Sequence, residues 1–490
     1  MNWNTLIEQF ELQIRQGQGS AVKKALTDVN VSQVPEIKFS SLANIATRVG
    51  LAPLALRLLD RKIRRTGFDS SDLSIAEKSE YACALTAIGA YPEAHRILVK
   101  LQAEQYPKIF LYRAYTFFNQ WRYQEAIPHL QKYLALTDLP YLRRVGEVNL
   151  CAALIYCLKY EEALKILSKL KTELIHEKQT LLLGNVLELQ AQCYLGQSRF
   201  KECDRVLTDA EKLLQGTGSY FGLFAMKWKA VSALMQKSHD GVARIDEVRN
   251  QARQFSHYET LRECDYYEGI YASKNELLQN VYYGSPFESY RKKILDSVNP
   301  KLFEAIHFEK RVGLTAPGGL QDKVGWKISS DEPLPGASRN SLLHNLQRLF
   351  LSDFYSSWRV GTIYSFLCPD DHYHVESSPN RVYQLIHRWN KLAEDAKLGV
   401  RIKSDGAGFR MMYFSPGVLC VTKLAELSNR ASTDLRVLRD HFGTRRFRST
   451  DAQAILKKSQ SQVSVLLKKA QDEGLKKSGS GRSTTYQFAG

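Results

Sequence analysis

The fold of the first half of the chain is decided by a short motif, Tyr160-Glu161-Glu162-Ala163, which Leu164-Lys165-Ile166-Leu167 follows. Three more copies keep an aromatic residue three positions before a small one: Tyr91-Pro92-Glu93-Ala94, Tyr123-Gln124-Glu125-Ala126 and Phe200-Lys201-Glu202-Cys203. The copies begin 32, 37 and 40 residues apart, and Ala55 and Ala243 mark fainter copies on either side. Recurrence at this period is typical of stacked structural repeats.

The residues around each copy predict two helices joined by a turn. Apolar residues recur at i, i+3, i+4 and i+7 over about the first 280 residues, and Pro and Gly gather at the ends of these stretches. One helix pair cannot bury its apolar stripe alone, so successive pairs are expected to stack into a superhelix with a concave groove.

This pattern resembles the tetratricopeptide repeat (TPR), in which an aromatic residue closes the turn and a small residue lets the paired helices approach. The resemblance covers about residues 40–280, and we assign residues 1–285 to a TPR-like helical domain. It implies that the groove holds a peptide or a segment of a partner protein. The alternative is an array that only spaces or dimerises the rest of the chain.

Residues 286–338 interrupt the helical pattern and are interpreted as an ordered connector. Pro and Gly are too dense here for continuous helix, and Lys323–Ile328 is a candidate short strand. The first half of the connector is alternatively a final capping helix. Arg291-Lys292-Lys293 is interpreted as a solvated helix face.

The charge of the chain points to a polyanionic partner. The net charge is +17, and residues 340–490 contribute +10 of it, from 23 basic and 13 acidic side chains. The sequence has no apolar window long enough for a membrane span and no secretion signal at its start. Its eight cysteines form no C-x-x-C pair. We therefore expect a cytoplasmic protein with reduced thiols and no membrane partner.

Residues 339–416 predict three helices followed by a hairpin. The helices cover 342–350, 360–367 and 381–392, with Ser378 as the cap of the third, and the hairpin turns at Gly406-Ala407-Gly408-Phe409-Arg410. This order and this tip resemble the winged helix of OmpR/PhoB-type response regulators. Trp389 and Asn390 stand where that family usually has Leu and Arg. No receiver domain precedes the module, so phosphorylation control is not implied.

Residues 417–490 predict a second module of the same kind. A short helix at 449–456, a helix at 461–475 and a basic hairpin at 476–488 resemble the winged helix-turn-helix of MarR- and DeoR-like regulators. The core is expected to contain Val463, Leu466, Leu467 and Ala470. Val465 stands where such proteins often have Arg.

Both resemblances imply duplex DNA as a partner, with a helix in the major groove and basic wing residues on phosphates. The candidate DNA-binding residues of the first module are Asn380, Arg381, Gln384, His387, Arg388, Lys391, Arg401, Lys403 and Arg410. Those of the second are Ser461, Gln462, Ser464, Lys468, Lys469, Lys476, Lys477 and Arg482.

The sequence has no motif that points to catalysis. It contains no phosphate-binding loop, no G-x-S-x-G and no H-E-x-x-H. Asp370-Asp371-His372-Tyr373-His374 is interpreted as a solvated loop, because a metal site needs further spaced ligands. We expect neither enzyme activity nor a metal or cofactor.

The sequence therefore predicts a mainly α protein, with an N-terminal α-solenoid and two C-terminal α+β winged-helix domains. The predicted function is a bacterial DNA-binding transcriptional regulator whose repeats sense a peptide or protein. The alternative is a non-catalytic scaffold in which repeats and winged helices both bind protein. A homodimer is a candidate state, since both module types often dimerise.

Overall fold

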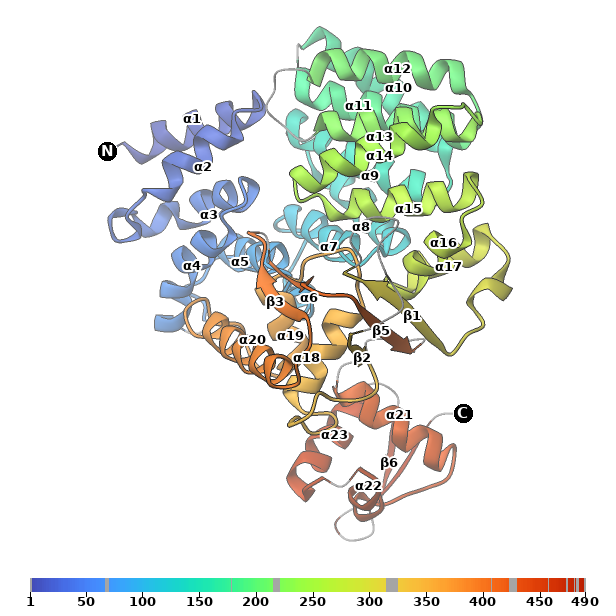
Figure 1. Cartoon of the computed structure of the whole chain (residues 1–490). Coiled ribbons are helices and arrows are strands. Elements are labelled where there is room, and N and C mark those ends of the chain that lie inside the picture. Colours follow the sequence, from blue (N-terminus) through green and yellow to red (C-terminus); the bar gives the residue numbers. More distant parts are fainter. Residues whose placement is uncertain are drawn as a thin grey trace. The chain divides into compact units, whose positions relative to one another are not determined.

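The computed structural model describes residues 2–66, 70–177, 179–214, 221–313, 325–406, 408–422, 430–456, 458–472, 475–479, 481 and 484–488. The chain divides into two compact units, Met1–Leu424 and Ala425–Gly490. Helices make up most of both units (Figure 1), so the expected mainly α class is confirmed.

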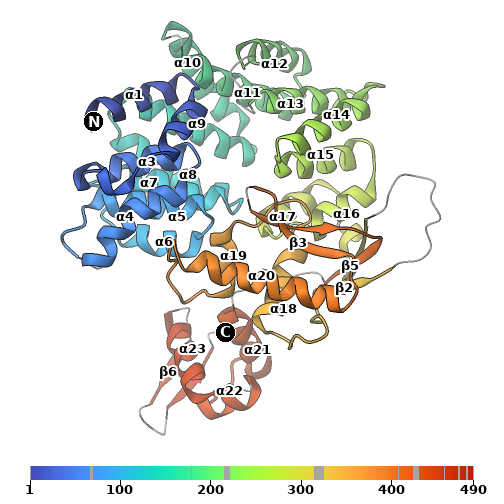
Figure 2. The same ribbon diagram turned by 60° about the vertical axis from the view of Figure 1, so that its left-hand side comes forward.

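The first unit begins with α1 (Trp3–Arg15), α2 (Gly19–Thr27) and two 3-10 turns at Val31–Gln33 and Glu36–Lys38. Seven helix pairs follow one another along the chain (Figure 2): α3 (Phe39–Arg48) with α4 (Ala52–Thr66), α5 (Ile75–Ala87) with α6 (Tyr91–Lys100), α7 (Lys108–Phe118) with α8 (Tyr123–Leu136), α9 (Pro140–Tyr156) with α10 (Tyr160–His176), α11 (Thr180–Gly196) with α12 (Phe200–Leu214), α13 (Phe221–Met235) with α14 (Gly241–Gln254), and α15 (Tyr258–Tyr271) with α16 (Asn275–Tyr283). We call α3–α16 the array. The first helices of neighbouring pairs also contact one another: α9 contacts α11, α11 contacts α13, and α13 contacts α15. They therefore form a layer of their own.

The repeated motif marks the start of the second helix in four pairs. Its aromatic residue is the first residue of α6, α8, α10 and α12, and its small residue is fully buried in each case: Ala94, Ala126, Ala163 and Cys203. Two positions before each aromatic residue the backbone takes a positive φ, at Gly89, Trp121, Leu158 and Ser198. Such a left-handed residue ends a helix and satisfies its last carbonyls. The helical array expected from the motif is thus confirmed.

The turn between α11 and α12 depends on the absence of a side chain at Gly196. A Cβ there would lie 2.2 Å from the ring carbon Cζ of Tyr160. Gly196→Ala is therefore expected to destabilise the first unit by about 1–2 kcal/mol, because the ring must shift. Urea unfolding measures the change. Gly222→Ala in α13, where an added Cβ meets nothing within 4 Å, serves as the control and should be neutral or stabilising. Equal losses in the two variants would contradict this reading.

The connector contributes a helix and two strands. It contains α17 (Glu288–Ser297), a 3-10 turn at Pro300–Phe303, β1 (His307–Val312) and β2 (Lys327–Ser329). Both strands pair with β5 (Gly417–Thr422), β1 antiparallel and β2 parallel, to give the sheet order β1-β5-β2. Residues 417–422 therefore belong to the first unit, whereas the sequence had placed them at the start of the second winged helix. The strand expected at Lys323–Ile328 lies at 327–329, and Lys323 and Val324 are outside the described residues.

Residues 339–416 fold as α18 (Leu342–Leu351), α19 (Val360–Leu367), α20 (Ser378–Asp395) and the antiparallel hairpin β3 (Val400–Ser404)–β4 (Phe409–Tyr413). An isolated bridge joins Trp358 to Phe409, which lies at the turn end of the hairpin. We call these residues the first module. The helices and the hairpin lie where the sequence predicted them. Assignment to the OmpR/PhoB-type winged helix stays a prediction.

The second unit has the same order of elements. It contains α21 (Arg430–Phe442), α22 (Ser449–Leu456), α23 (Gln460–Asp472) and the antiparallel pair β6 (Lys476–Ser478)–β7 (Thr485–Gln487), with a bridge between Phe447 and Tyr486. Its separate core includes the expected residues Val463, Leu466, Leu467 and Ala470. The MarR/DeoR-like assignment stays a prediction.

Candidate functional site

The layer of first helices lines a cavity of ≈ 880 Å³. Its walls come from α9, α11, α13 and α15, from the turn before α8, and from α17 of the connector. This volume lies toward the upper end of the range for ligand pockets, about 300–1,000 Å³. The groove that the repeats predict therefore includes a half-open cavity, which we call the array cavity.

Aromatic side chains cover much of the array cavity. Tyr123 and Tyr156 stack with ring centroids 4.2 Å apart, and Trp228 meets Tyr267 edge to face at 5.6 Å. Trp121 lies at the rim and packs edge to face on Tyr290 at 4.5 Å. Tyr and Trp offer large contact areas at a low cost in side-chain entropy, and they are enriched where proteins bind peptides and other proteins.

Charged groups of the array cavity are partly paired. The Lys227 ammonium donates to Glu263 at 2.6 Å and lies 4.3 Å from the ring centroid of Trp228. Glu188, next to the cavity on α11, accepts hydrogen bonds from the Trp228 indole and from Gln192. Burial raises the pKa of Glu188, although Lys227 opposes this shift. These contacts fix the polar groups of the walls before any ligand arrives.

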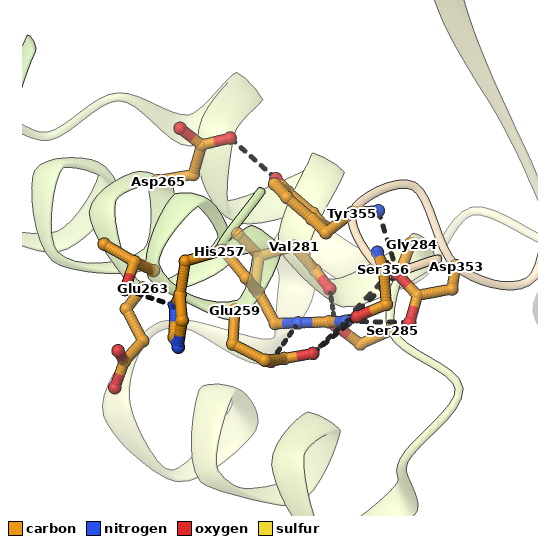
Figure 3. A network of polar contacts seen from close by, with 12 residues as sticks. His257, Glu259, Glu263, Asp265, Val281, Gly284, Ser285, Asp353, Tyr355 and Ser356 are labelled. Carbon is orange, nitrogen blue, oxygen red and sulfur yellow. Dashed lines mark hydrogen bonds and ion pairs between the residues drawn. The ribbon is translucent and has the colours of Figure 1, made fainter. Parts of the chain in front are cut away.

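A buried ion network joins α15 to the first module (Figure 3). Arg262 is 0% exposed, and its guanidinium donates to both carboxylate oxygens of Asp353 at 3.0 and 2.7 Å. It also donates to Glu259 and to the Ser285 hydroxyl. Burial alone lowers the pKa of Arg262, but Asp353 and Glu259 outweigh burial and the net shift is upward. Arg262 is therefore charged, and its contacts attach the loop between α18 and α19 to the array.

A second set of contacts joins the first module to the other end of the array. Arg359 donates to the carbonyl of Ala87 at 2.7 Å, and Glu93 of α6 accepts the backbone N–H of Tyr373 at 2.9 Å. His372 lies 3.1 Å from the same carboxylate. Residues 370–374, interpreted from the sequence as a solvated loop, thus dock on the array and bury Tyr373.

The candidate DNA residues of the first module fall into two groups. Gln384, His387, Arg388 and Lys391 are exposed along one side of α20. The others have contacts within the first unit: Asn380 with the Glu376 carbonyl, Arg381 with Asp371 and Tyr364, Arg401 with Glu394, Lys403 with the Phe414 ring and Arg410 with the Tyr258 ring of α15. Arg410 is directed toward the array, and we leave it out of the DNA surface proposed below.

Asn390 has a structural role that its position in the sequence did not reveal. Its side chain donates to the carbonyl of Ile402 at 2.9 Å and accepts the N–H of the same residue at 2.8 Å. Trp389 beside it is fully buried. The two departures from the OmpR/PhoB pattern therefore attach α20 to the hairpin and to the core.

The candidate residues of the second unit lie on α23 and on the hairpin after it. Ser461, Gln462, Ser464, Lys468, Lys476 and Lys477 are all exposed, and so is Val465. The side chain of Lys469 and the whole of Arg482 lie outside the described residues. Sequence reasoning missed the exposed Arg445, Arg446 and Arg448 between α21 and α22, although three arginines in four residues were a visible signal.

The described residues hold no group of three or more His, Cys, Asp or Glu placed to bind a metal ion. None of the helices in the described ranges is long and apolar enough to cross a membrane. All eight cysteines are free thiols.

No family model and no curated protein matches the chain. A solved structure from Podosopora anserina, a kinesin light chain of nearly identical TPR-like repeats, is 18% identical, covers 37% of this chain and 94% of its own, and has a TM-score of 0.31. A Rap protein complexed with competence and sporulation factor is 12% identical over 61% of this chain and 96% of its own, at a TM-score of 0.41. The apo form of RapI is 14% identical, covers 57% of this chain and 83% of its own, and has a TM-score of 0.36. Structural similarity at these low TM-scores assigns no site residue in this chain, so the candidate sites depend on the geometry described above.

Proposed function

We propose that the protein is a transcriptional regulator that binds a peptide or protein segment in the array cavity and duplex DNA through its C-terminal helices and hairpins. The observation that supports this proposal most directly is the array cavity itself. The cavity is large and rich in aromatic side chains, and the first helices of successive pairs line it. An extended chain bound there can therefore contact several repeats at once.

The DNA half of the proposal is supported by the polar surface of the second unit. Gln462, Ser464 and Lys468 are exposed on α23, and Lys476 and Lys477 are exposed on the strand that follows. A helix fits the major groove of DNA, where polar side chains meet base edges, and lysines beside it neutralise phosphates. The exposed side of α20, which carries Gln384, His387, Arg388 and Lys391, is a second surface of polar and basic side chains.

Salt dependence of DNA binding by the full chain tests this half. The first module must stay attached to the array, because Arg262 and Asp353 are buried against each other. Fluorescence anisotropy with a labelled mixed-sequence duplex should show affinity falling about 10- to 100-fold between roughly 50 and 200 mM salt, as expected for about two to four phosphate contacts. Absent binding, or binding that salt does not change, would reject the DNA half.

A scaffold that binds only proteins is the second candidate. It is favoured by one observation, since the first module already uses its loops to bind protein, namely the array of the same chain. Under this function the array cavity still binds a peptide, but the anisotropy experiment shows no DNA complex. A homodimer, the oligomeric state expected from the sequence, is compatible with both functions.

A further inference from the structure

The charges that line the array cavity do not balance. Its basic residues are Arg122, Lys227, Lys292 and Lys293, and its acidic ones are Glu125, Glu263 and Asp296. Four of these groups form two ion pairs, Arg122 with Glu125 at 2.9 Å and Lys227 with Glu263 at 2.6 Å. Lys292 and Asp296 are exposed on α17. Among the described basic residues that line the cavity, Lys293 is therefore the one that is neither in an ion pair nor exposed.

The Lys293 ammonium is surrounded by aromatic rings instead of carboxylates. It lies 5.2 Å from the ring centroid of Tyr156, 5.0 Å from that of Tyr266 and 5.9 Å from that of Tyr290. Burial lowers its pKa, and Glu263 only partly opposes the shift. Within the described residues, no acceptor forms a hydrogen bond or ion pair with this ammonium. Arg291-Lys292-Lys293 is thus not wholly the solvated face that the sequence suggested.

Two of the rings near Lys293 carry hydroxyl groups that are also without partners in the described residues. The hydroxyls of Tyr156 and Tyr290 are buried, and neither forms a hydrogen bond in the part of the chain that the structure describes. Tyr156 lines the cavity, and Tyr290 packs on Trp121 and Tyr266, which line it as well. Both hydroxyls are shielded from solvent, so Lys293, which lines the cavity, is the group of this set that is left to meet a ligand.

The geometry points to a carboxylate-binding subsite in the array cavity, in which the Lys293 ammonium pairs with a carboxylate of the bound peptide. The inference rests on the proposed peptide-binding function and specifies its ligand. A single partly buried cation matches a singly charged carboxylate, whereas a phosphate carries about −1.5 to −2 and is usually held by arginine forks. The carboxylate comes from the C-terminus of the peptide or from an Asp or Glu side chain.

Affinity selection with the full chain tests the subsite. Three random peptide libraries serve as probes: one without Asp and Glu that ends in a free carboxylate, the same library ending in an amide, and an amide-ended library that includes Asp and Glu. The wild-type protein should retain the first or the third far better than the second. Retention of the first identifies a C-terminal carboxylate, and retention of the third identifies an acidic side chain.

Variants then connect the result to the subsite. Lys293→Met should weaken binding of the selected peptides by about 10- to 100-fold, because it removes the donor to a charged acceptor. Lys301→Met, at an exposed lysine outside the cavity, should have no effect. Lys293→Met should unfold at the same or a higher temperature, because it removes a partly buried charge that has no countercharge within the described residues, so weaker binding would not reflect misfolding.

Two outcomes would overturn the subsite and leave peptide binding intact. One is equal retention of the neutral amide-ended library, and the other is unchanged affinity of the selected peptides for Lys293→Met. If the wild-type chain retains no peptide from any library, the proposed peptide-binding function fails together with the subsite.

Discussion

Replacing Arg262 with methionine is expected to lower the free energy of unfolding of the first unit by about 3–5 kcal/mol. The side chains of Arg262 and Asp353 are 0% and 1% exposed. Removing the guanidinium leaves the Asp353 carboxylate buried without a countercharge, and it also leaves the Ser285 hydroxyl without its 2.5 Å partner. Urea denaturation followed by circular dichroism measures the loss.

Two further variants separate the buried network from a general effect of losing an arginine. Arg244→Met removes an exposed i,i+4 pair with Asp240 in α14 and should leave the unfolding midpoint nearly unchanged. The double variant Arg262→Met/Asp353→Leu removes both buried charges and should recover part of the lost stability. Equal losses for Arg262→Met and Arg244→Met would show that the network does not stabilise the fold.

The position of Arg262 also suggests how the two proposed functions are connected. One side of α15 presents Glu263, Tyr266 and Tyr267 to the array cavity. The adjoining face of the same helix presents Glu259, Arg262 and Asp265 to residues 353–356 of the first module. A ligand that shifted α15 would therefore act on the contacts that attach the loop between α18 and α19 to the array.

The array was predictable from sequence because its determinants are local. The aromatic residue of each motif begins a helix, and the small residue three positions later lies where two helices meet. The fainter copy at Ala243 was less accurate: Ala243 is exposed, and Gly241 makes the close approach, since a Cβ there would lie 3.1 Å from the Leu234 nitrogen. The helices and hairpin of residues 339–416 were equally local and lie where they were expected.

The contacts that join these parts were not predictable, because they depend on residues far apart in the chain. Arg262 and Asp353 are 91 positions apart, and β5 pairs with β1 across more than 100 residues. Nothing local distinguishes Lys293 from its neighbours Arg291 and Lys292. Its aromatic surroundings come from Tyr156 of α9 and Tyr266 of α15, and only the tertiary fold brings those rings to it.

Neutralising three lysines of the second unit is expected to abolish most DNA affinity if the proposed function is correct. Lys468 lies on α23, and Lys476 and Lys477 lie on β6, and all three are exposed. Each phosphate contact contributes about 0.9 to the slope of log K against log salt. Losing three contacts in K468Q/K476Q/K477Q should therefore reduce the slope by about 2.7 and weaken binding by roughly two to three orders of magnitude near 0.1 M salt.

A matched triple variant, K165Q/K201Q/K212Q, removes the same charge from exposed lysines of the array. It should lower DNA affinity only slightly and keep the salt slope, because these lysines lie on α10 and α12 and not on the proposed DNA surface. Anisotropy with the same labelled duplex compares the two variants. Equal losses would mean that net charge alone drives the binding. Full affinity in K468Q/K476Q/K477Q would move the DNA contact to the exposed side of α20, where Arg388→Gln and Lys391→Gln become the decisive substitutions.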